Sequence, residues 1–341
     1  MQDTQKQMIP DWVWALLAVA IVVVAFALAL TDRGKEPGEA LVYDVSKYEA
    51  VKESDVRYQE TSRIALDMPV PSALALDSEG HIWVAGDGTL VKLDATGQEL
   101  ARHEIDGHPH CIAVAPDAMI YLGMKDHVVA LNKEGVLQGD WELLGERAWL
   151  TSIVANEASV FVADSGNACV YRYDRDGVLL NTIGKRDVEK DIPGFVVPSH
   201  YFDVALDPMG SLWIVHPGKL GLENYREDGT MLSAWYRPGF DVDKFPGCCN
   251  PAHVAFKSDT TLVAAQKGIN CIKAFAADHS FTGLVATPEM LDAGWNKNDF
   301  PDDMTPVRDL AVDANDRILA LHGPLRTLMI FEPIPDAREE Q

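Results

Sequence analysis

One pattern of three short apolar strands occurs six times along the chain, and this repetition limits the possible folds more than any other feature. In each copy an apolar stretch leads through an Asp/Gly-containing turn to a second stretch and then to a third. The six first strands lie at 72–80, 110–118, 151–158, 203–210, 253–260 and 309–316. Short apolar runs separated by turn residues indicate antiparallel hairpins. Copies with a period of roughly 40 residues predict propeller blades, because a β-sandwich has no reason to repeat one motif.

The ends of the repeat region indicate how the ring closes. The sixth copy ends at Pro333 without a fourth strand, whereas the strand-like segment 61–68 precedes the first copy and has no hairpin partner. We expect 61–68 to complete the last blade, which removes the open edges of the ring. The six copies align without a gap inside their first two strands. The sequence therefore predicts an all-β, six-bladed propeller over 57–333, followed by a C-terminal tail at 334–341.

The repeats also carry a family resemblance. Segments 108–126, 150–177 and 304–323 resemble the pattern P-x-x-I-A-V-D-x-x-G-x-I-Y-V-A-D of the NHL-repeat propellers, and the likeness extends over about 57–333. Members of that family include protein-interaction platforms, extracellular sensors and a lyase that releases C-terminal amides from hydroxyglycine-extended peptides. That lyase binds its metal through histidines in P-H-x-x-A segments of the innermost strands, a form that 109–113 fits here. The resemblance implies a six-bladed fold and leaves the function open.

The N-terminal region contains an apolar run, 12–30, without a charged side chain. At 1.5 Å per residue its 19 residues reach across close to ~30 Å, the hydrocarbon thickness of a bilayer. We predict a single membrane-spanning helix at 12–30, with a short tail at 1–11 and a tether at 31–56. A cleaved signal peptide is the alternative, because alanines near the end of the run offer small residues for processing. A signal anchor places the following domain outside the cytoplasm, so we expect a single-pass membrane protein with a periplasmic or extracellular propeller.

The charge balance excludes one class of partner. With 52 acidic and 29 basic residues the formal net charge is −23, and nucleic-acid binding requires clustered Lys and Arg. The acids and bases of residues 1–35 cancel, so the whole excess belongs to residues 36–341. Anionic lipid surfaces repel such a domain, and we expect the span alone to hold it at the membrane. We therefore expect the ligands of its channel to be cationic groups or metal ions.

The innermost strands predict a ring of polar side chains around the channel. Equivalent positions of the six copies hold Ala73, Cys111, Thr151, Asp203, His253 and Asp309, and the preceding positions hold Ser72, His110, Leu150, Phe202, Ala252 and Arg308. Neighbouring residues of a strand point to opposite faces, and we expect the first set to face the channel. The candidate metal ligands are His110, Cys111, Asp203, His253 and Asp309, for a divalent ion such as Zn or Ca. The candidate ligand-binding residues of the ring are Thr151, Asp203 and Asp309. The alternative is that these groups bond to ordered water and backbone.

Long connections between blades mark one face of the predicted ring. They lie at 184–200, 238–251 and 284–306, and the last of them is expected to contain a short helix starting near Pro288. Binding residues are concentrated on such loops. The second loop contains Cys248 and Cys249, two further candidate ligand-binding residues. A vicinal disulfide, a soft-metal site for Cu(I) or Zn together with His253, and an ordinary disulfide to Cys169 or Cys271 remain open alternatives.

These observations predict a binding or assembly module that acts through its loop-rich channel face. We expect its partner to be a membrane protein or another extracytoplasmic protein. The competing hypothesis is a metal-dependent enzyme, either amidating-lyase-like or lactonase-like, with a metal centred in the channel. A weaker alternative is a redox or metal-handling accessory protein that uses Cys248 and Cys249. Whether the chain is an enzyme stays open at this point.

Overall fold

The computed structural model describes residues 52–189, 192–295 and 305–335. The predicted anchor at 12–30, the tail at 1–11 and all but the end of the tether lie outside these residues, as does most of the C-terminal tail. Within the described residues, no helix combines the length and the apolar character that crossing a membrane requires. The predicted membrane span is therefore neither supported nor contradicted by the described part of the chain.

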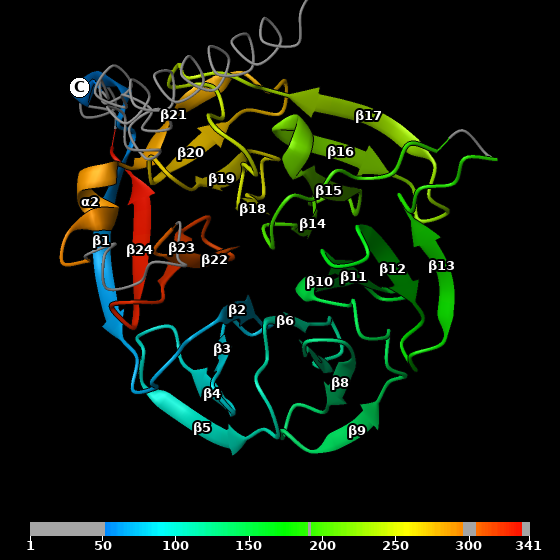
Figure 1. The fold of residues 1–341 in the computed structure, drawn as a ribbon. Helices are drawn as coiled ribbons and strands as arrows, with labels where there is room; N and C mark the ends of the chain where they lie inside the picture. The colour runs from blue at the N-terminus through cyan, green and yellow to red at the C-terminus, as the bar shows by residue number, and fades with distance from the viewer. Residues whose placement is uncertain (1–51, 190–191, 296–304, 336–341) are drawn as a thin grey trace, which may run out of the picture. The chain divides into compact units, whose positions relative to one another are not determined.

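Six sheets stand around a central axis, and each is a four-stranded antiparallel blade (Figure 1). The first three blades consist of β2 (Ala73–Leu76), β3 (Ile82–Gly86), β4 (Thr89–Leu93) and β5 (Glu99–Glu104); β6 (Cys111–Val114), β7 (Ile120–Gly123), β8 (Val128–Leu131) and β9 (Leu137–Asp140); and β10 (Leu150–Ala155), β11 (Val160–Asp164), β12 (Cys169–Tyr173) and β13 (Leu179–Ile183). The fourth and fifth consist of β14 (Val204–Leu206), β15 (Leu212–His216), β16 (Gly221–Tyr225) and β17 (Met231–Tyr236); and β18 (His253–Phe256), β19 (Leu262–Gln266), β20 (Cys271–Phe275) and β21 (Phe281–Ala286). In each of these blades the first strand lies innermost and the fourth lies on the rim (Figure 1).

The sixth blade joins the two ends of the propeller. It consists of β22 (Val307–Val312), β23 (Ile318–His322), β24 (Thr327–Pro333) and, from the start of the described chain, β1 (Tyr58–Ala65). β1 pairs antiparallel with β24 in a register that runs from Tyr58 opposite Pro333 to Ala65 opposite Thr327. The prediction that the early strand closes the ring is confirmed, and so is the all-β, six-bladed fold.

Little helix accompanies these strands in the described residues. It comprises the 3-10 turns η4 (Glu53–Asp55) and η5 (Pro217–Lys219) and the helix α2 (Pro288–Asp292). The α2 helix begins after Thr287, whose side chain accepts a hydrogen bond from the Met290 N–H. The short helix expected near Pro288 is therefore present, and its start follows the preference for a capping threonine followed by proline.

Apolar side chains fill the space between neighbouring blades. One such cluster joins Leu74 and Ile82 of the first blade to Leu321 and Leu328 of the sixth. The second strand of a blade is covered on both faces, so β3, β11, β19 and β23 are buried along their whole length. A strand buried on both faces needs an unbroken apolar run, which explains the continuous apolar stretches of the repeats.

The predicted gap-free alignment of the repeats is wrong in the third copy. In the other five blades the turn after the innermost strand closes from residue i to residue i+4, as from the Asp77 N–H to the His81 carbonyl. In the third blade the turn closes one residue earlier, from the Asn156 N–H to the Ser159 carbonyl. Ser152, and not Thr151, therefore lies opposite Ala163, the position that corresponds to Ala73 opposite Ala85. The register of β10 shifts at this point by a bulge between Leu150 and Ser152.

Candidate functional site

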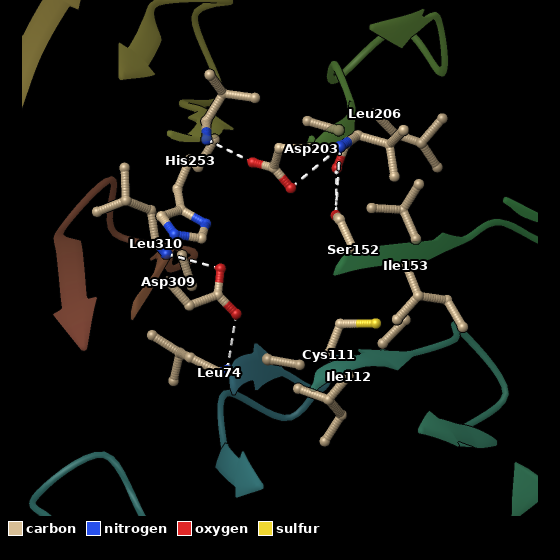
Figure 2. A pocket seen from close by; sticks show the side chains of 18 of the residues that line it. Leu74, Cys111, Ile112, Ser152, Ile153, Asp203, Leu206, His253, Asp309 and Leu310 are labelled. Atoms are coloured by element: carbon tan, nitrogen blue, oxygen red, sulfur yellow. Dashed lines mark hydrogen bonds between the residues drawn. The ribbon is translucent and has the colours of Figure 1, made fainter. Parts of the chain in front are cut away.

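The innermost strands of all six blades enclose a central cavity of about 330 Å³ (Figure 2). Residues at equivalent strand positions of the six blades form a ring: Ala73, Cys111, Ser152, Asp203, His253 and Asp309. All of them except Ala73 line the cavity. Side chains at this position reach the following blade: Asp203 and Asp309 bind backbone N–H groups there, and Ala73 belongs to the apolar cluster that contains Ile112 of the second blade. Of the six predicted ring residues, Cys111, Thr151, Asp203, His253 and Asp309 line the cavity and Ala73 does not, and Ser152 occupies the strand position that was predicted for Thr151. The preceding positions are not excluded from the cavity, because His110 and Arg308 also line it.

Both aspartates of the ring bind backbone N–H groups of two blades. Asp203 accepts hydrogen bonds from Val204 N in its own blade (3.0 Å) and from Val254 N in the fifth blade (2.7 Å). Asp309 accepts from Leu310 N in its own blade and from Leu74 N in the first blade, both at 2.8 Å. The innermost strands are edges whose N–H groups would otherwise lack an acceptor. These carboxylates therefore hold neighbouring blades together, which is the structural alternative considered for the ring.

Two hydroxyl groups of the third blade also form hydrogen bonds to the neighbouring blade. Ser152 Oγ accepts a hydrogen bond from Val204 N in the fourth blade at 3.2 Å. Thr151 Oγ1 donates to the Phe202 carbonyl at 2.5 Å and lies 3.5 Å from the Ala163 carbonyl. Ser72 makes the same pair of contacts in the first blade, to the carbonyls of Pro109 and Ala85. Thr151 therefore corresponds to Ser72, the residue before the ring, and links two blades.

The titrating groups of the ring are shifted towards their uncharged forms. Burial raises the pKa of Asp203 to about 6, and burial together with the charge of Asp203 raises the pKa of Asp309 to about 8. Burial and the nearby Arg308 lower the pKa of His253 to about 3. Burial and the two carboxylates hold the pKa of the Cys111 thiol well above its ordinary value. Near neutral pH the thiol and the imidazole of the ring are therefore uncharged.

The five predicted metal ligands do not form a metal centre. Among the described residues, which include all five, no three His, Cys, Asp or Glu side chains lie together in a way that could hold a metal ion. The reason is that the carboxylates are engaged by backbone N–H groups and that the ring spreads its side chains over different blades. His110 lies at the preceding position and turns to another set of neighbours.

His110 belongs to an aromatic cluster at one end of the channel. Its ring lies 5.0 Å from that of Trp149, centroid to centroid, and the Trp149 ring stacks on His200 at 4.4 Å. Trp149 and His200 come from the connections that lead into the third and fourth blades. His110 and Trp149 are half-buried and His200 is exposed, while His110 also lines the central cavity. We call His110, Trp149 and His200 the histidine–tryptophan cluster.

A turn of the third blade fixes Trp149 in place. The backbone N–H of Trp149 donates to Asp164 Oδ1 at 2.9 Å, and the Trp149 carbonyl accepts from the backbone N–H (3.0 Å) and the hydroxyl (3.1 Å) of Ser165. Asp164 is itself fully buried and accepts two further hydrogen bonds from Asn167. The indole is therefore carried on a rigid support, although it lies on a connecting segment.

The hydrogen bonds also assign the tautomers of the two histidines. Ser165 Oγ lies 3.1 Å from the Trp149 carbonyl and 3.0 Å from His200 Nδ1; with the hydroxyl donating to that carbonyl, His200 Nδ1 donates to Ser165 Oγ. His110 Nδ1 lies 3.2 Å from the Leu150 carbonyl, which can only accept. Burial lowers the pKa of both imidazoles, so both are neutral near pH 7 with an unprotonated Nε2. In the part of the chain that the structure describes, neither Nε2 has a hydrogen-bond partner.

The cysteine pair lies in the loop before the fifth blade. All five cysteines of the chain are free thiols, so neither a vicinal disulfide nor a bond to Cys169 or Cys271 is present. Cys248 is exposed and Cys249 is buried. Burial raises the pKa of the Cys249 thiol, and Ser199, Cys248 and Lys267 lie around it. The predicted soft-metal set is absent as well, because Cys248, Cys249 and His253, all within the described residues, do not come together as a group that could hold a metal ion.

Sequence reasoning identified His110 and missed Trp149 and His200. The available signal was the length of the connection at 184–200, which ends at His200. Trp149 directly precedes an innermost strand and breaks no pattern, so nothing in the repeat distinguishes it from a core aromatic residue.

Comparisons with known proteins show the fold. No family model and no curated protein matches the sequence. Among solved structures, a streptogramin B lyase has 11% identity and a TM-score of 0.53, over 83% of this chain and 100% of that one. Virginiamycin B lyase from Staphylococcus aureus has 13% identity and a TM-score of 0.52, over 82% and 89%. A catalytically inactive variant of that enzyme, solved with quinupristin, has 12% identity over the same shares, also with a TM-score of 0.52.

At these identities the likeness establishes architecture and nothing finer. The chain is a six-bladed β-propeller, and several proteins that share its fold are lyases. Membership of the NHL-repeat family stays a prediction.

Proposed function

We propose that this chain is a binding module that takes an aromatic cation at the mouth of its central channel, through the histidine–tryptophan cluster. The observation that carries the proposal is the arrangement of two neutral imidazoles around one indole, each with its Nε2 free to accept a hydrogen bond. Polar groups without a partner, held on rigid supports beside a cavity, are typical of small-molecule sites.

The chemistry of these groups selects the ligand class. The face of an indole attracts cations by roughly 0.5–2 kcal/mol, and unprotonated Nε2 atoms accept hydrogen bonds from amidinium, guanidinium or ammonium groups. Asp203 and Asp309 place acidic groups further along the channel, and the net charge of −23 raises the local concentration of cations. An aromatic ring with a cationic substituent suits all three features: the cation-attracting face of the indole, the hydrogen-bond acceptors of the imidazoles and the negative electrostatic potential of the chain.

The same chemistry is available from a small molecule or from the side chains of a protein partner. Loops that carry binding residues on a rigid scaffold are typical of both kinds of module. The apolar run at 12–30 supports placement of this module as a single-pass membrane protein with the propeller outside the cytoplasm. A protein partner would accordingly be a membrane or extracytoplasmic protein.

Titration calorimetry of the purified full-length chain with benzamidine tests the proposal. Saturable binding is expected, with at least about tenfold weaker affinity after Trp149→Leu or His110→Phe, a loss of about 1.4 kcal/mol. His108→Phe is the matched control, because His108 is 74% exposed, lies two residues from His110 and contacts Asp87 instead of the cluster. Benzamide, which lacks the charge, is expected to bind more weakly. Absence of binding, or an equal loss in the control variant, contradicts the proposal.

A second candidate function is a lyase, the class of the solved neighbours. The observation that favours it is His110, since a neutral imidazole with an unprotonated Nε2 on the wall of a cavity has the form that a general base requires. Incubation with quinupristin, followed by mass spectrometry, tests this candidate. Conversion that His110→Phe abolishes and His108→Phe retains supports it, and recovery of unchanged quinupristin rejects this substrate.

A further inference from the structure

The cysteine pair forms a site that the proposed binding function does not use. Cys248 is exposed, whereas the Cys249 side chain is only 1% exposed. The two cysteines are adjacent in sequence, and the Cys248 side chain is among the groups that interact with the Cys249 thiol. The arrangement is one accessible thiol backed by one protected thiol.

The loop that carries the pair is held firmly against the fifth blade. Asn250 is buried, and its side-chain amide donates to the carbonyls of Pro246 (2.9 Å) and Lys267 (3.2 Å). Its side-chain oxygen accepts from the Lys267 N–H at 2.9 Å. These three hydrogen bonds fix Asn250, the residue that follows Cys249. The backbone that carries the two thiols therefore moves little relative to the fifth blade.

The other three cysteines provide an internal contrast. Cys111, Cys169 and Cys271 begin strands inside three different blades and are 4%, 0% and 3% exposed. Burial raises the pKa of each of these thiols. Thiolates are the reactive form of cysteine, so these three are inert under native conditions. Cys249 is also buried and its pKa is also raised, but unlike these three it lies next to the exposed Cys248, so a compound bound at Cys248 brings the reacting sulfur to it.

We propose that Cys248 and Cys249 form a dithiol site that reduces an external disulfide. Cys248 loses its proton to solvent, and its thiolate attacks one sulfur of that disulfide. The external S–S bond breaks, one thiolate leaves and takes a proton from water, and a mixed disulfide remains on Cys248. The Cys249 sulfur then attacks the Cys248 sulfur, the mixed disulfide bond breaks, and the departing external thiolate takes up the proton of the Cys249 thiol; the second external thiol is released and the Cys248–Cys249 bond is closed. The balance is one external disulfide reduced to two thiols and one dithiol oxidised.

Adjacent cysteines make this exchange readily reversible. Their Cα atoms are ~3.8 Å apart across a trans peptide, below the ~4.4–6.8 Å that disulfides usually span. The closed pair is consequently strained, and strained disulfides are the labile ones. An excess of free thiol is expected to reopen it, so the site cycles between the two forms.

Mass spectrometry of the reduced full-length chain after exposure to oxidised glutathione, with free thiols then alkylated, tests the site. The unmodified chain is expected to lose two hydrogens and to carry no glutathione adduct, and peptide mapping should link Cys248 to Cys249. Cys249→Ser should retain glutathione on Cys248, Cys248→Ser should retain none, and Cys169→Ala should behave as the unmodified chain. A disulfide-bonded peptide in place of glutathione distinguishes a protein substrate from a small one.

Three results overturn the proposal: a stable adduct on the unmodified chain, release of glutathione from Cys249→Ser, or loss of two hydrogens by Cys248→Ser. Melting temperatures of all variants verify that they are folded. If Cys249→Ser does not fold, the peptide map of the unmodified chain decides, because absence of the Cys248–Cys249 link after oxidation is itself contradictory.

Discussion

The carboxylate of Asp309, on the last blade, accepts a hydrogen bond of 2.8 Å from the backbone N–H of Leu74, on the first blade. The ring is thus joined twice between chain segments far apart in sequence, on the rim by the pairing of β1 with β24 and at the channel by this contact. Asp203 makes the equivalent contact between the fourth and fifth blades. The channel carboxylates are accordingly explained by architecture, which leaves the histidine–tryptophan cluster as the candidate for ligand binding.

Replacing Asp309 with Asn is expected to destabilise the protein. Asparagine replaces one of the two accepting oxygens with an NH2 group, which cannot accept a hydrogen bond. Either the Leu74 or the Leu310 N–H therefore loses its acceptor, at a cost of about 1–3 kcal/mol. Urea denaturation measures the change in the free energy of unfolding. Asp176→Asn, at an exposed aspartate of a turn, is the matched control and should change it by less than about 0.5 kcal/mol. Equal effects of the two substitutions would show that Asp309 does not hold the blades together.

The raised pKa of Asp309 predicts a pH dependence of stability. An unfolded aspartate titrates near ~3.9, whereas the folded pKa is about 8, so the folded state binds more protons between these values. This contribution to stability is complete at low pH and is lost as the pH rises through about 8. Asp203 acts in the same direction up to about pH 6. His253 has the opposite effect on stability. Because its pKa is lowered to about 3 in the folded protein, the folded state loses stability relative to the unfolded state as the pH falls below ~6.5.

A comparison of the native chain with Asp309→Asn isolates the contribution of Asp309 to the pH dependence of stability. The destabilisation caused by Asp309→Asn should be larger at about pH 5 than at about pH 9, because only the native aspartate gains from the bound proton. Urea denaturation at both pH values provides the numbers. A destabilisation that is constant or grows with pH is incompatible with a raised pKa.

Glu223→Gln is expected to loosen the connection that carries His200. His216 Nε2 accepts from Val196 N in that connection (3.0 Å), and its Nδ1 donates to Glu223 at 2.8 Å. Burial favours the neutral form of Glu223, but hydrogen bonds from His216, Tyr225 and Tyr236 outweigh it and hold the pKa well below its usual range. Neutralising this buried acceptor should cost about 1–3 kcal/mol and speed amide hydrogen exchange around Val196. Glu146→Gln, at an exposed glutamate, is the control and should change neither the free energy of unfolding nor the rate of amide hydrogen exchange. If amide exchange around Val196 is unaltered in Glu223→Gln, the connection does not depend on the hydrogen bonds of Glu223.

The repeats determined most of the fold in advance, and one blade shows their limit. Strand positions, the closing strand at 61–68 and the helix at Pro288 all follow from apolar runs and turn residues, which act locally. The third blade deviates because its turn, Asn156 to Ser159, is one residue shorter, and Thr151 and Ser152 are chemically interchangeable in a sequence alignment. Only the observed register of β10 with β11 separates them.

The site was less predictable for a physical reason. His110 stands out by sequence, but its neighbours Trp149 and His200 arrive from connections without periodicity, placed by hydrogen bonds to Asp164 and Ser165. Conversely, Asp203 and Asp309 are of a residue type that often binds metal ions. Only the three-dimensional structure shows that their carboxylates accept hydrogen bonds from backbone N–H groups instead.

Nitrogen NMR of the histidine side chains tests the proposed binding site most directly, in the uniformly labelled full-length chain before and during addition of benzamidine. We expect His110 and His200 to be neutral near pH 7 with the proton on Nδ1, and their Nε2 resonances to shift saturably with one common dissociation constant. The His108 resonances should stay in place. Protonated rings, the opposite tautomer or Nε2 resonances that ignore the ligand would contradict the proposed binding site.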